Sequence, residues 1–318
     1  MTLKALLVEA AHRQSIPLAN ALDLDSALLG PAVHRYDQWL DSGFDGEMAY
    51  LKRGRDRRAD PRKVFPDAQS ILCVAVPYSA RALGQVDPAR GVRYARYLRG
   101  EDYHRWLPKK IDALLTEASE RWVNLGEAPL RWKTCVDTSA LLERAWAALA
   151  GLGWIGKNAM LIHPQYGSYL FLGFALLDQP VNAGPRPLKD YCGNCTRCLK
   201  ACPTQALTED KALDSRRCIS YWTLEKRGPI VLGPEDQSAI GNWVAGCDLC
   251  QEACPFNLKA EAASEEPLEQ APLPSRWEDL AHLTPDQYVN SVSTAALNRI
   301  KPQDFQRNLE LAWSNRPR

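Results

Sequence analysis

The chain has 318 residues, of which 46% are hydrophobic and 24% are charged, a composition that excludes a wholly disordered or fibrous protein. The 39 Lys and Arg residues nearly balance the 38 Asp and Glu residues, so overall charge gives no argument for a nucleic-acid or membrane partner. No apolar run reaches the roughly 18 residues of a membrane-spanning helix, and residues 1–14 lack the apolar core of a signal peptide. We therefore expect a cytoplasmic protein, in which cysteines are more often metal ligands than disulfides.

Residues 1–187 are predicted to form a mixed α/β (α+β) domain. Apolar residues recur at helical spacing in some segments and form short apolar runs, typical of buried strands, in others. The expected helices span residues 2–14, 108–126 and 139–150, and the expected strands span residues 70–76, 159–162 and 169–177. Cys73 lies inside the first strand and is expected to be a core residue. Basic stretches at Lys52–Lys63 and Arg90–Lys110 lie between these elements, and aromatic residues are interleaved in the second.

A cysteine-rich module follows a joint rich in Pro and Gly. Eight of the ten cysteines fall within residues 192–254. The first run is Cys192-x2-Cys195-x2-Cys198-x3-Cys202-Pro203, the spacing of bacterial ferredoxins, in which three thiolates bind one iron–sulfur cluster and the fourth binds a second cluster. We predict a ferredoxin-like domain over residues 188–260, followed by a linker and a helical tail over residues 261–318.

The second run, Cys247-x2-Cys250-x3-Cys254-Pro255, lacks its first cysteine, because Val244 stands at that position. Cys218 is the spare cysteine nearby and is expected to supply the missing ligand. The prediction is two 4Fe–4S clusters, one bound by Cys192, Cys195, Cys198 and Cys254, and the other by Cys218, Cys247, Cys250 and Cys202. Paired C-x2-C motifs also suit structural zinc sites, but the repeated x3-C-P endings favour clusters.

One glycine motif points to a turn. Gly151-x-Gly153-x-x-Gly156 matches a dinucleotide-binding pattern, which requires a strand before it and a helix after it. Here the preceding segment is expected to be helical and the following one extended, so the glycines are interpreted as a helix stop and a tight turn. The five histidines show no metal-ligand spacing and are expected to be structural or exposed.

Characteristic stretches are spread over residues 40–315 in addition to the cysteine runs. They are Gly46-Glu-Met-Ala-Tyr-Leu51, Asp60-Pro-Arg62, Arg99-Gly-Glu-Asp-Tyr-His104, Cys135-Val-Asp-Thr-Ser-Ala-Leu-Leu-Glu-Arg144, Ala150–Asn158, Gly167-Ser168, Arg217-Cys-Ile-Ser-Tyr221 and Gly246–Asn257. Together they resemble the epoxyqueuosine reductase family. The resemblance implies an oxidoreductase that reduces epoxyqueuosine to queuosine at the wobble position of tRNA, the last step of queuosine biosynthesis.

The resemblance also implies cobalamin beside the two 4Fe–4S clusters, bound in a nitroreductase-like domain related to reductive dehalogenases. Cobalamin is expected base-off, without a protein His ligand. The sequence agrees, because Asp102-x-His104 begins the D-x-H-x-x-G motif that supplies such a ligand but Leu107 stands where Gly is needed.

The family motif makes Asp137 the expected proton donor for the opening epoxide. We expect burial against the corrin and Leu141 to raise its pKa, which makes a carboxyl a better acid at neutral pH. The alternative is that Asp137 only begins a helix ahead of Ser139, a place that Asp favours.

The remaining contacts implied by the resemblance involve cofactor and RNA. Cobalamin is expected to meet Arg57, Asp137, Leu161, Ser220, Cys247 and Asp248. The substrate or its tRNA is expected to meet Lys157, Asn158, Arg131, Lys133 and Arg227, because phosphates require a local cationic patch. For any one of these cations the alternative is a solvated surface charge.

The expected partners are a tRNA anticodon stem-loop and a low-potential electron donor, with no membrane, and the expected state is a monomer. Many family members continue into a C-terminal helical-repeat extension, which is not expected in this chain. Two other functions are considered. A reductive dehalogenase would carry a twin-Arg export signal, which is not found in the sequence. A ferredoxin-like electron carrier would leave roughly 190 upstream residues without a role.

Overall fold

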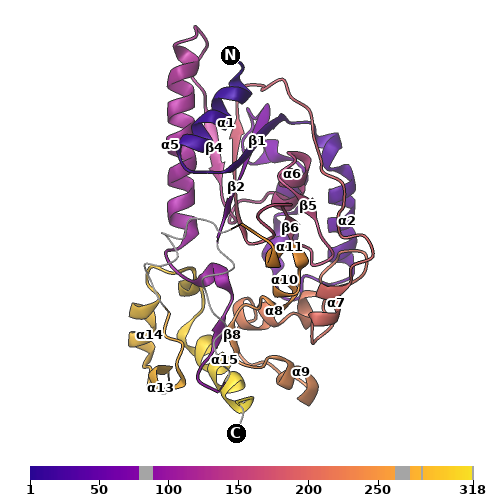
Figure 1. Ribbon diagram of the computed structural model, residues 1–318, viewed down its shortest axis with the longest axis vertical. Helices are drawn as coiled ribbons and strands as arrows, with labels where there is room; N and C mark the ends of the chain where they lie inside the picture. The colour runs from indigo at the N-terminus through magenta and orange to yellow at the C-terminus, as the bar shows by residue number, and fades with distance from the viewer. Residues whose placement is uncertain (79–88, 262–272, 281, 317–318) are drawn as a thin grey trace.

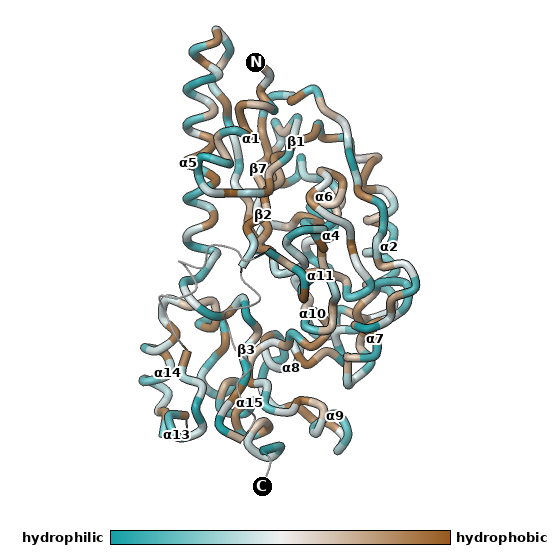
Figure 2. Tube along the Cα trace, in the orientation of Figure 1, coloured by the Kyte–Doolittle hydropathy of each residue, from teal (hydrophilic) through white to brown (hydrophobic). Residues whose placement is uncertain are grey.

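The computed structural model describes residues 1–78, 89–261, 273–280 and 282–316 (Figure 1). A four-stranded antiparallel sheet with the order β1-β2-β7-β4 is the centre of the first domain. The strands are β1 (Leu18–Asp23), β2 (Ser70–Pro77), β7 (Leu170–Leu177) and β4 (Trp132–Cys135). Figure 2 shows β2 and β7 as hydrophobic segments, as expected for strands covered on both faces.

Helices cover both faces of the sheet. On one face, α1 (Leu3–Arg13) and α5 (Tyr103–Val123) pack on Leu72 and Val74. On the other face, α6 (Glu143–Leu149) packs on Ile71 and Cys73, with α2 (Gly30–Asp41) beside it. Alternate residues of β2 point to opposite faces of the sheet, so one strand serves both cores. Cys73 is a core residue, as the sequence predicts.

Two expected helices begin at different residues from those predicted. Helix α5 begins at Tyr103 instead of residue 108, because the Asp102 side chain accepts the His104 amide and caps the helix, leaving Pro108 inside it. Helix α6 begins at Glu143 instead of residue 139, because Asp137 adopts a left-handed φ of 53° and the chain that follows it forms a loop. The helix over residues 2–14 and the strands over residues 70–76 and 169–177 are confirmed.

The glycine motif forms a turn, as expected. Gly151 has a φ of +83° directly after α6, and a Cβ there would meet the carbonyl oxygen of Arg186 at 2.6 Å. The chain then forms a small antiparallel pair, β5 (Trp154–Ile155) and β6 (Leu161–Ile162). No helix follows the glycines in this described segment, so the segment lacks the geometry of a dinucleotide site.

Short helices carry the cysteine runs. They are α7 (Arg197–Ala201), α8 (Ile219–Leu224), α9 (Pro234–Ala239), α10 (Leu249–Glu252) and α11 (Pro255–Leu258). Helix α7 contains Cys198 and packs against α10, which contains Cys250. The two cysteine runs are thereby brought side by side. Short helical turns elsewhere are η1 (Ser26–Leu29), α3 (Ala49–Arg53), α4 (Arg55–Ala59), η2 (Pro61–Lys63), η3 (Arg96–Leu98), η4 (Ser215–Arg217) and η5 (Ala296–Arg299).

The tail and one early segment share a second core. Strand β3 (Arg93–Tyr94) pairs in parallel with β8 (Trp243–Ala245). Around this pair lie α13 (Trp277–Leu280), α14 (Pro285–Ser291) and α15 (Pro302–Ser314), in the lower half of Figure 1. Most of the expected linker over residues 261–274 lies outside the described residues. Among the residues that are described, no helix is long and apolar enough to cross a membrane.

Candidate functional site

The cysteines of the module lie in two groups of four. In the first group, burial raises the pKa of the Cys198 thiol, and the neighbouring thiols of Cys192 and Cys254 raise it further. Burial also raises the pKa of the Cys254 thiol, with Cys192 and Cys195 as its thiol neighbours. The structure therefore places Cys254, from the second run, among the first three cysteines of the first run.

The second group has the reverse composition. Burial raises the pKa of the Cys250 thiol well above its ordinary value, and the thiols of Cys247, Cys218 and Cys202 add to that rise. Cys202 comes from the first run and Cys218 from the segment between the runs. The first run thus contributes Cys202 to the group formed mainly by the second run, and the second run contributes Cys254 to the group formed mainly by the first. All eight cysteines of the module belong to one of the two groups.

Within the described ranges, no three His, Cys, Asp or Glu side chains are grouped as ligands of a single metal ion.

Asp137 and His104 face each other beside the end of β4. It follows β4, its side chain is 47% exposed, and its Oδ2 lies 3.2 Å from His104 Nε2. The Asp137 amide donates to Glu143 Oε1 at 2.8 Å, which holds the loop against the first turn of α6. Asp137 does not cap a helix, so the alternative role proposed for it from the sequence is wrong.

The electrostatics of Asp137 also differ from the expectation. Burial alone would raise its pKa, but the hydrogen bond and positive charge of His104 outweigh burial and lower the pKa below its ordinary value. Leu141 packs instead in the apolar cluster beneath the loop, with Leu161. Glu143 carries the raised pKa: burial, reinforced by the charge of Asp137, raises it to about 8.

His104 is the site residue that the sequence analysis missed. Its Nδ1 lies 2.6 Å from Oδ1 of Asp102, the residue that caps α5. The sequence does contain a pattern that predicts this contact, an Asp two positions before a His at the start of a helix. When that Asp caps the helix, the imidazole lies beside the capping carboxylate. The partner on the other side, Asp137, is distant in sequence and left no local signal.

Buried polar groups lie between Asp137 and the second cysteine group. Asp248 is 2% exposed and its Oδ2 accepts the Arg96 amide at 2.8 Å. The Arg96 guanidinium stands over the ring of Tyr169 at 5.0 Å. Burial raises the pKa of Tyr97, Arg299 opposes the rise, and both Asp137 and Asp248 add to it, so Tyr97 lies within reach of both carboxylates.

Two hydrogen-bond donors in this region are buried without a partner among the described residues. They are Nη1 of Arg96 and the hydroxyl of Tyr169. A buried donor left unpaired costs about 1–3 kcal/mol, so such groups usually mark a bound ligand or ordered water. The region beside Asp248 therefore has unmet capacity to bind a polar ligand.

The other expected cofactor contacts are dispersed. Arg57 is exposed on α4, Leu161 is buried in β6, and Ser220 is half-buried on α8, two residues after Cys218. Asn158 is 3% exposed and its Nδ2 has no hydrogen-bond partner in the described part of the chain. Lys157 is occupied, because its Nζ donates to the Gly193 carbonyl at 2.9 Å and braces the first cysteine loop.

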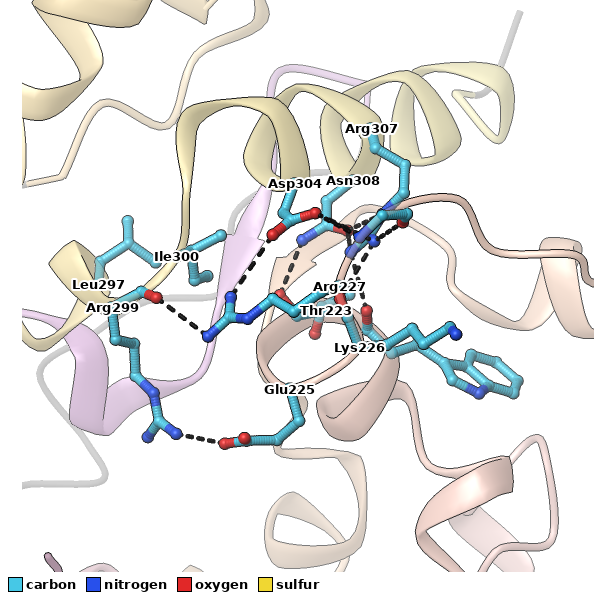
Figure 3. A network of polar contacts seen from close by, with 12 residues as sticks. Thr223, Glu225, Lys226, Arg227, Leu297, Arg299, Ile300, Asp304, Arg307 and Asn308 are labelled. Carbon is cyan, nitrogen blue, oxygen red and sulfur yellow. Dashed lines mark hydrogen bonds and ion pairs between the residues drawn. The ribbon is translucent and has the colours of Figure 1, made fainter. Parts of the chain in front are cut away.

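The expected tRNA contacts divide into two places. Arg131 lies at the start of β4, opposite the end that leads to Asp137, and is paired with Asp67 and Asp178 at 3.1 and 2.8 Å. Lys133 is exposed on the same strand. Arg227 lies elsewhere, where its Nη2 donates to the Arg299 carbonyl at 3.2 Å (Figure 3).

Arg299 contacts Arg227 through its carbonyl and acts on Asp137 through its charge. Its guanidinium pairs with Glu225, as Figure 3 shows. Its positive charge also lowers the pKa of Asp137, after the larger effects of burial and His104. Arg299 is thus a cation whose charge reaches Asp137, and Arg227 contacts its backbone, whereas Arg131 and Lys133 belong to the sheet.

Comparison with known proteins places this site in a family. Residues 58–138 match the family model described as epoxyqueuosine reductase QueG, DUF1730, and residues 191–257 match the 4Fe-4S double cluster binding domain. Two solved structures of epoxyqueuosine reductase superpose with TM-scores of 0.83 and 0.80, at 29% and 28% identity over 98% of this chain and 81% of each solved chain. The second of these holds a tRNA-Tyr stem loop modified with epoxyqueuosine.

Curated relatives agree with the structural neighbours. The epoxyqueuosine reductase of Gloeobacter violaceus is 39% identical, over 95% of this chain and 91% of its own length. That of a Synechococcus species is 36% identical, over 97% of this chain and 94% of its own length. The expected fold class, a mixed helix-and-strand domain followed by a two-cluster iron–sulfur domain, is confirmed. The chain belongs to the epoxyqueuosine reductase family, and is thus an oxidoreductase.

Proposed function

We propose that the protein reduces epoxyqueuosine within the anticodon stem-loop of a tRNA to queuosine, with Asp137 donating a proton to the epoxide oxygen. The observation that carries this proposal is the position of Asp137. Its carboxylate is half exposed and pairs with an imidazole whose pKa is raised, and the charges of Asp137 and of Asp248, which is next to Cys247, both act on Tyr97. A relative at 28% identity holds an epoxyqueuosine-modified tRNA stem loop.

We assign one 4Fe–4S cluster to Cys192, Cys195, Cys198 and Cys254, and the other to Cys202, Cys218, Cys247 and Cys250. The two thiol groups described above support this assignment. The first cluster is flanked by the exposed residues Tyr191, Gly193 and Asn194, whereas the second lies toward Asp248. Electrons from a low-potential donor would enter at the first cluster and leave from the second.

Cobalamin would occupy the space between the second cysteine group and Asp137. Reduced cobalamin, bound base-off, supplies a strongly nucleophilic cobalt for opening the epoxide. The unpaired donors of Arg96 and Tyr169 fit a ligand rich in amide oxygens, and we assign Ser220 and Asp248 to the same ligand. We retain Cys247 as a contact there and Asn158, with its unpaired amide, as a further one. Leu161 and Arg57 lie farther from the proposed cobalamin position between the second cysteine group and Asp137.

The protein's own residues manage the proton and the substrate. As the epoxide opens, negative charge develops on its oxygen, and Asp137 supplies the proton that neutralises it. The loop hydrogen bond to Glu143 holds the Asp137 backbone while its side chain stays accessible. A relative from Bacillus subtilis, at 26% identity, is described with its catalytic aspartate loop swung out of the active site. A comparable movement of residues 137–142 would admit the nucleotide.

Arg299 is the cation we assign to a tRNA phosphate, because its charge acts on Asp137, and Arg227, which donates to the Arg299 carbonyl, is assigned with it. Arg131 and Lys133 lie toward the start of β4, away from the end that leads to Asp137, so we place them outside this RNA surface. We propose a three-part organisation: the sheet domain within residues 1–187, the cluster domain within residues 188–260 and the tail within residues 261–318. In this organisation, residues 91–98 of the first part pack with the tail within residues 261–318. The working form is a cytoplasmic monomer.

Turnover by Asp137→Asn tests the proposal. The protein, with both clusters reconstituted under anaerobic conditions, is given a chemical reductant and epoxyqueuosine RNA, with and without cobalamin, and nucleosides are analysed by mass spectrometry. We expect loss of one oxygen by the wild type only with cobalamin, and a rate at least 100-fold lower for the variant. Wild-type turnover by Asp137→Asn with clusters and cobalamin intact would contradict the acid role. Failure to bind cobalamin, with no product, would favour an electron carrier.

A further inference from the structure

Both ring nitrogens of His104 face a carboxylate. Nδ1 lies 2.6 Å from Asp102 Oδ1, and Nε2 lies 3.2 Å from Asp137 Oδ2. The imidazole side chain is 21% exposed and Asp102 is 19% exposed, so the pair is largely shielded, whereas Asp137 is open to solvent on its outer side. The ring of Tyr103 lies against the imidazole, with centroids 4.0 Å apart.

This geometry fixes a count of protons. A neutral imidazole has one N–H donor and one lone pair, and an ionised carboxylate only accepts. A neutral ring between two ionised carboxylates would therefore point its lone pair at one of them. The arrangement is satisfied only when one additional proton is present, either on the ring or on one of the two carboxylates.

The surrounding charges decide where that proton rests. Burial disfavours a charged ring, but the hydrogen bonds to Asp102 and Asp137 outweigh it and raise the pKa of His104 to about 9. Glu143 on α6, which its raised pKa of about 8 keeps mostly protonated at neutral pH, and Arg299 from the tail are the other titratable groups that the described residues bring to the Asp137 carboxylate. At neutral pH the additional proton therefore resides on the imidazole, and both carboxylates are ionised.

We propose that His104 is a positioning residue that stores the proton which Asp137 delivers to the substrate, and that Asp102 keeps this store filled. The proposal rests on the proposed function and adds the source of the proton. In the delivery step the N–H bond at Nε2 breaks and an O–H bond forms on the Asp137 carboxylate, which gives its proton to the developing alkoxide. The ring ends neutral, the substrate oxygen ends as a hydroxyl, and no electron is transferred to or from these residues.

Asp102 determines that the His104 ring exchanges its proton at Nε2. Its hydrogen bond keeps the remaining proton on Nδ1, so the neutral ring exposes its lone pair at Nε2, where it takes a new proton from solvent. The same carboxylate caps α5 through the His104 amide, which fixes the ring relative to the backbone. An Asn at position 102 caps a helix as well as Asp does but carries no charge. Asp102→Asn therefore removes the charge and keeps the fold.

The first test measures the imidazole directly. The cluster-loaded protein without cobalamin is labelled with ¹³C-histidine, and the His104 signal is identified by its absence in His104→Gln. We expect it to titrate near pH 9, well above an ordinary histidine, and Asp102→Asn to shift it down by at least about one unit. A ring that titrates near 6.5, or that Asp102→Asn leaves unmoved, overturns the proposal.

The second test measures single-turnover rates against pH with a chemical reductant, cobalamin and epoxyqueuosine RNA. The wild-type rate should fall on the alkaline side as His104 loses its proton, and in Asp102→Asn this fall should move to lower pH by the amount seen in the titration. His104→Gln should slow turnover at least tenfold. The exposed His12 gives a matched control, because His12→Gln should change nothing. An alkaline fall that stays in place in Asp102→Asn contradicts the proposal.

The two tests separate this proposal from the proposed function. If the wild type fails to reduce epoxyqueuosine RNA, the substrate assignment fails, yet the titration of His104 still decides whether the Asp102–His104–Asp137 arrangement holds a proton. If turnover is normal and His104 titrates as an ordinary histidine, the function stands and the proton store is wrong.

Discussion

Ser168 and Asn257 exchange hydrogen bonds in both directions. The Ser168 amide donates to Asn257 Oδ1 at 2.6 Å, and Asn257 Nδ2 donates to Ser168 Oγ at 2.9 Å. Asn257 Nδ2 also donates to the Gln251 carbonyl at 2.7 Å, and all these groups are buried. Ser168 precedes β7 and Asn257 lies in α11, directly after Cys254. This contact therefore fixes the segment that follows Cys254, which we assign to a cluster, to the central sheet.

Replacing Asn257 with Ala should loosen this joint. The change leaves the Ser168 amide buried without a partner, at about 1–3 kcal/mol, and removes one of the two donors to the Gln251 carbonyl, which keeps the Cys254 amide. We expect a lower unfolding midpoint in denaturant and partial loss of the cluster that Cys254 binds, measured as iron per protein. The exposed residue Asn290 provides the control, since Asn290→Ala should change neither quantity. Full iron content with unchanged stability in Asn257→Ala would show that the joint is dispensable.

The partition of the cysteines can be tested by combining substitutions. Cys254→Ser and Cys192→Ser should each remove one cluster, about half of the iron, and the double variant should lose no more than either single variant. Cys254→Ser with Cys250→Ser should lose both clusters, because these ligands belong to different groups. Cys73→Ala is the control, since Cys73 is a core residue that should not affect iron. Additive loss of iron for Cys192 with Cys254 would contradict the assignment.

Glu143 should make stability depend on pH. A carboxyl whose pKa rises on folding, here from 4.5 to about 8, binds protons more tightly in the folded state, so its destabilising effect grows as pH rises between those values. Glu143→Gln keeps an oxygen for the Asp137 amide and removes the charge. We expect the variant to match the wild type at pH 5 and to exceed it by about 1–3 kcal/mol at pH 9 in thermal or denaturant unfolding. A difference that does not change with pH would contradict the raised pKa.

Asn308 should hold the tail on the cluster domain. It is fully buried, and its Nδ2 donates to the Thr223 carbonyl at 2.8 Å (Figure 3). The same Nδ2 donates to the Val244 carbonyl at 2.9 Å. Asn308→Ala should cost about 2–4 kcal/mol, because two buried carbonyls lose their donor. Gln303→Ala, at an exposed position of the same helix, should have an effect within about 0.5 kcal/mol. Equal stability of the two variants would sink this role.

Arg299 should contribute to RNA affinity, whereas Arg131 should not. Loss of one phosphate contact weakens binding and lowers the slope of log K against log salt by about one. Binding of an unmodified anticodon stem-loop, measured between about 50 and 200 mM salt, should show this change in Arg299→Ala. Arg131→Ala should retain the wild-type slope, since Arg131 lies immediately before β4, at the end of the strand opposite to Asp137. The opposite ranking would move the RNA surface to the start of β4.

The sequence predicted features that depend on local pattern. The cysteine spacings led to a partition that agrees with the thiol groups, and the apolar run at residues 70–76 gave strand β2. Two local signals compete at the start of α5. Pro108 favours a helix that begins there, but the Asp102 cap makes the helix begin at Tyr103, five residues earlier. Features made by distant residues left no signal. His104 needs Asp137, and β3 needs β8, so neither could be found without the fold.

The pairing of β3 with β8 also constrains when the molecule can be completed. Arg93 and Trp243 are partners although 150 positions separate them, and α15 closes the same core from the last described residues. During synthesis, Val92, Tyr94 and Leu98 leave the ribosome long before the residues that cover them. The second cysteine group is attached to this late-forming core through β8, so the cluster that we assign to it can be held stably only after α15 has been made. Cluster delivery is therefore expected to follow the synthesis of α15.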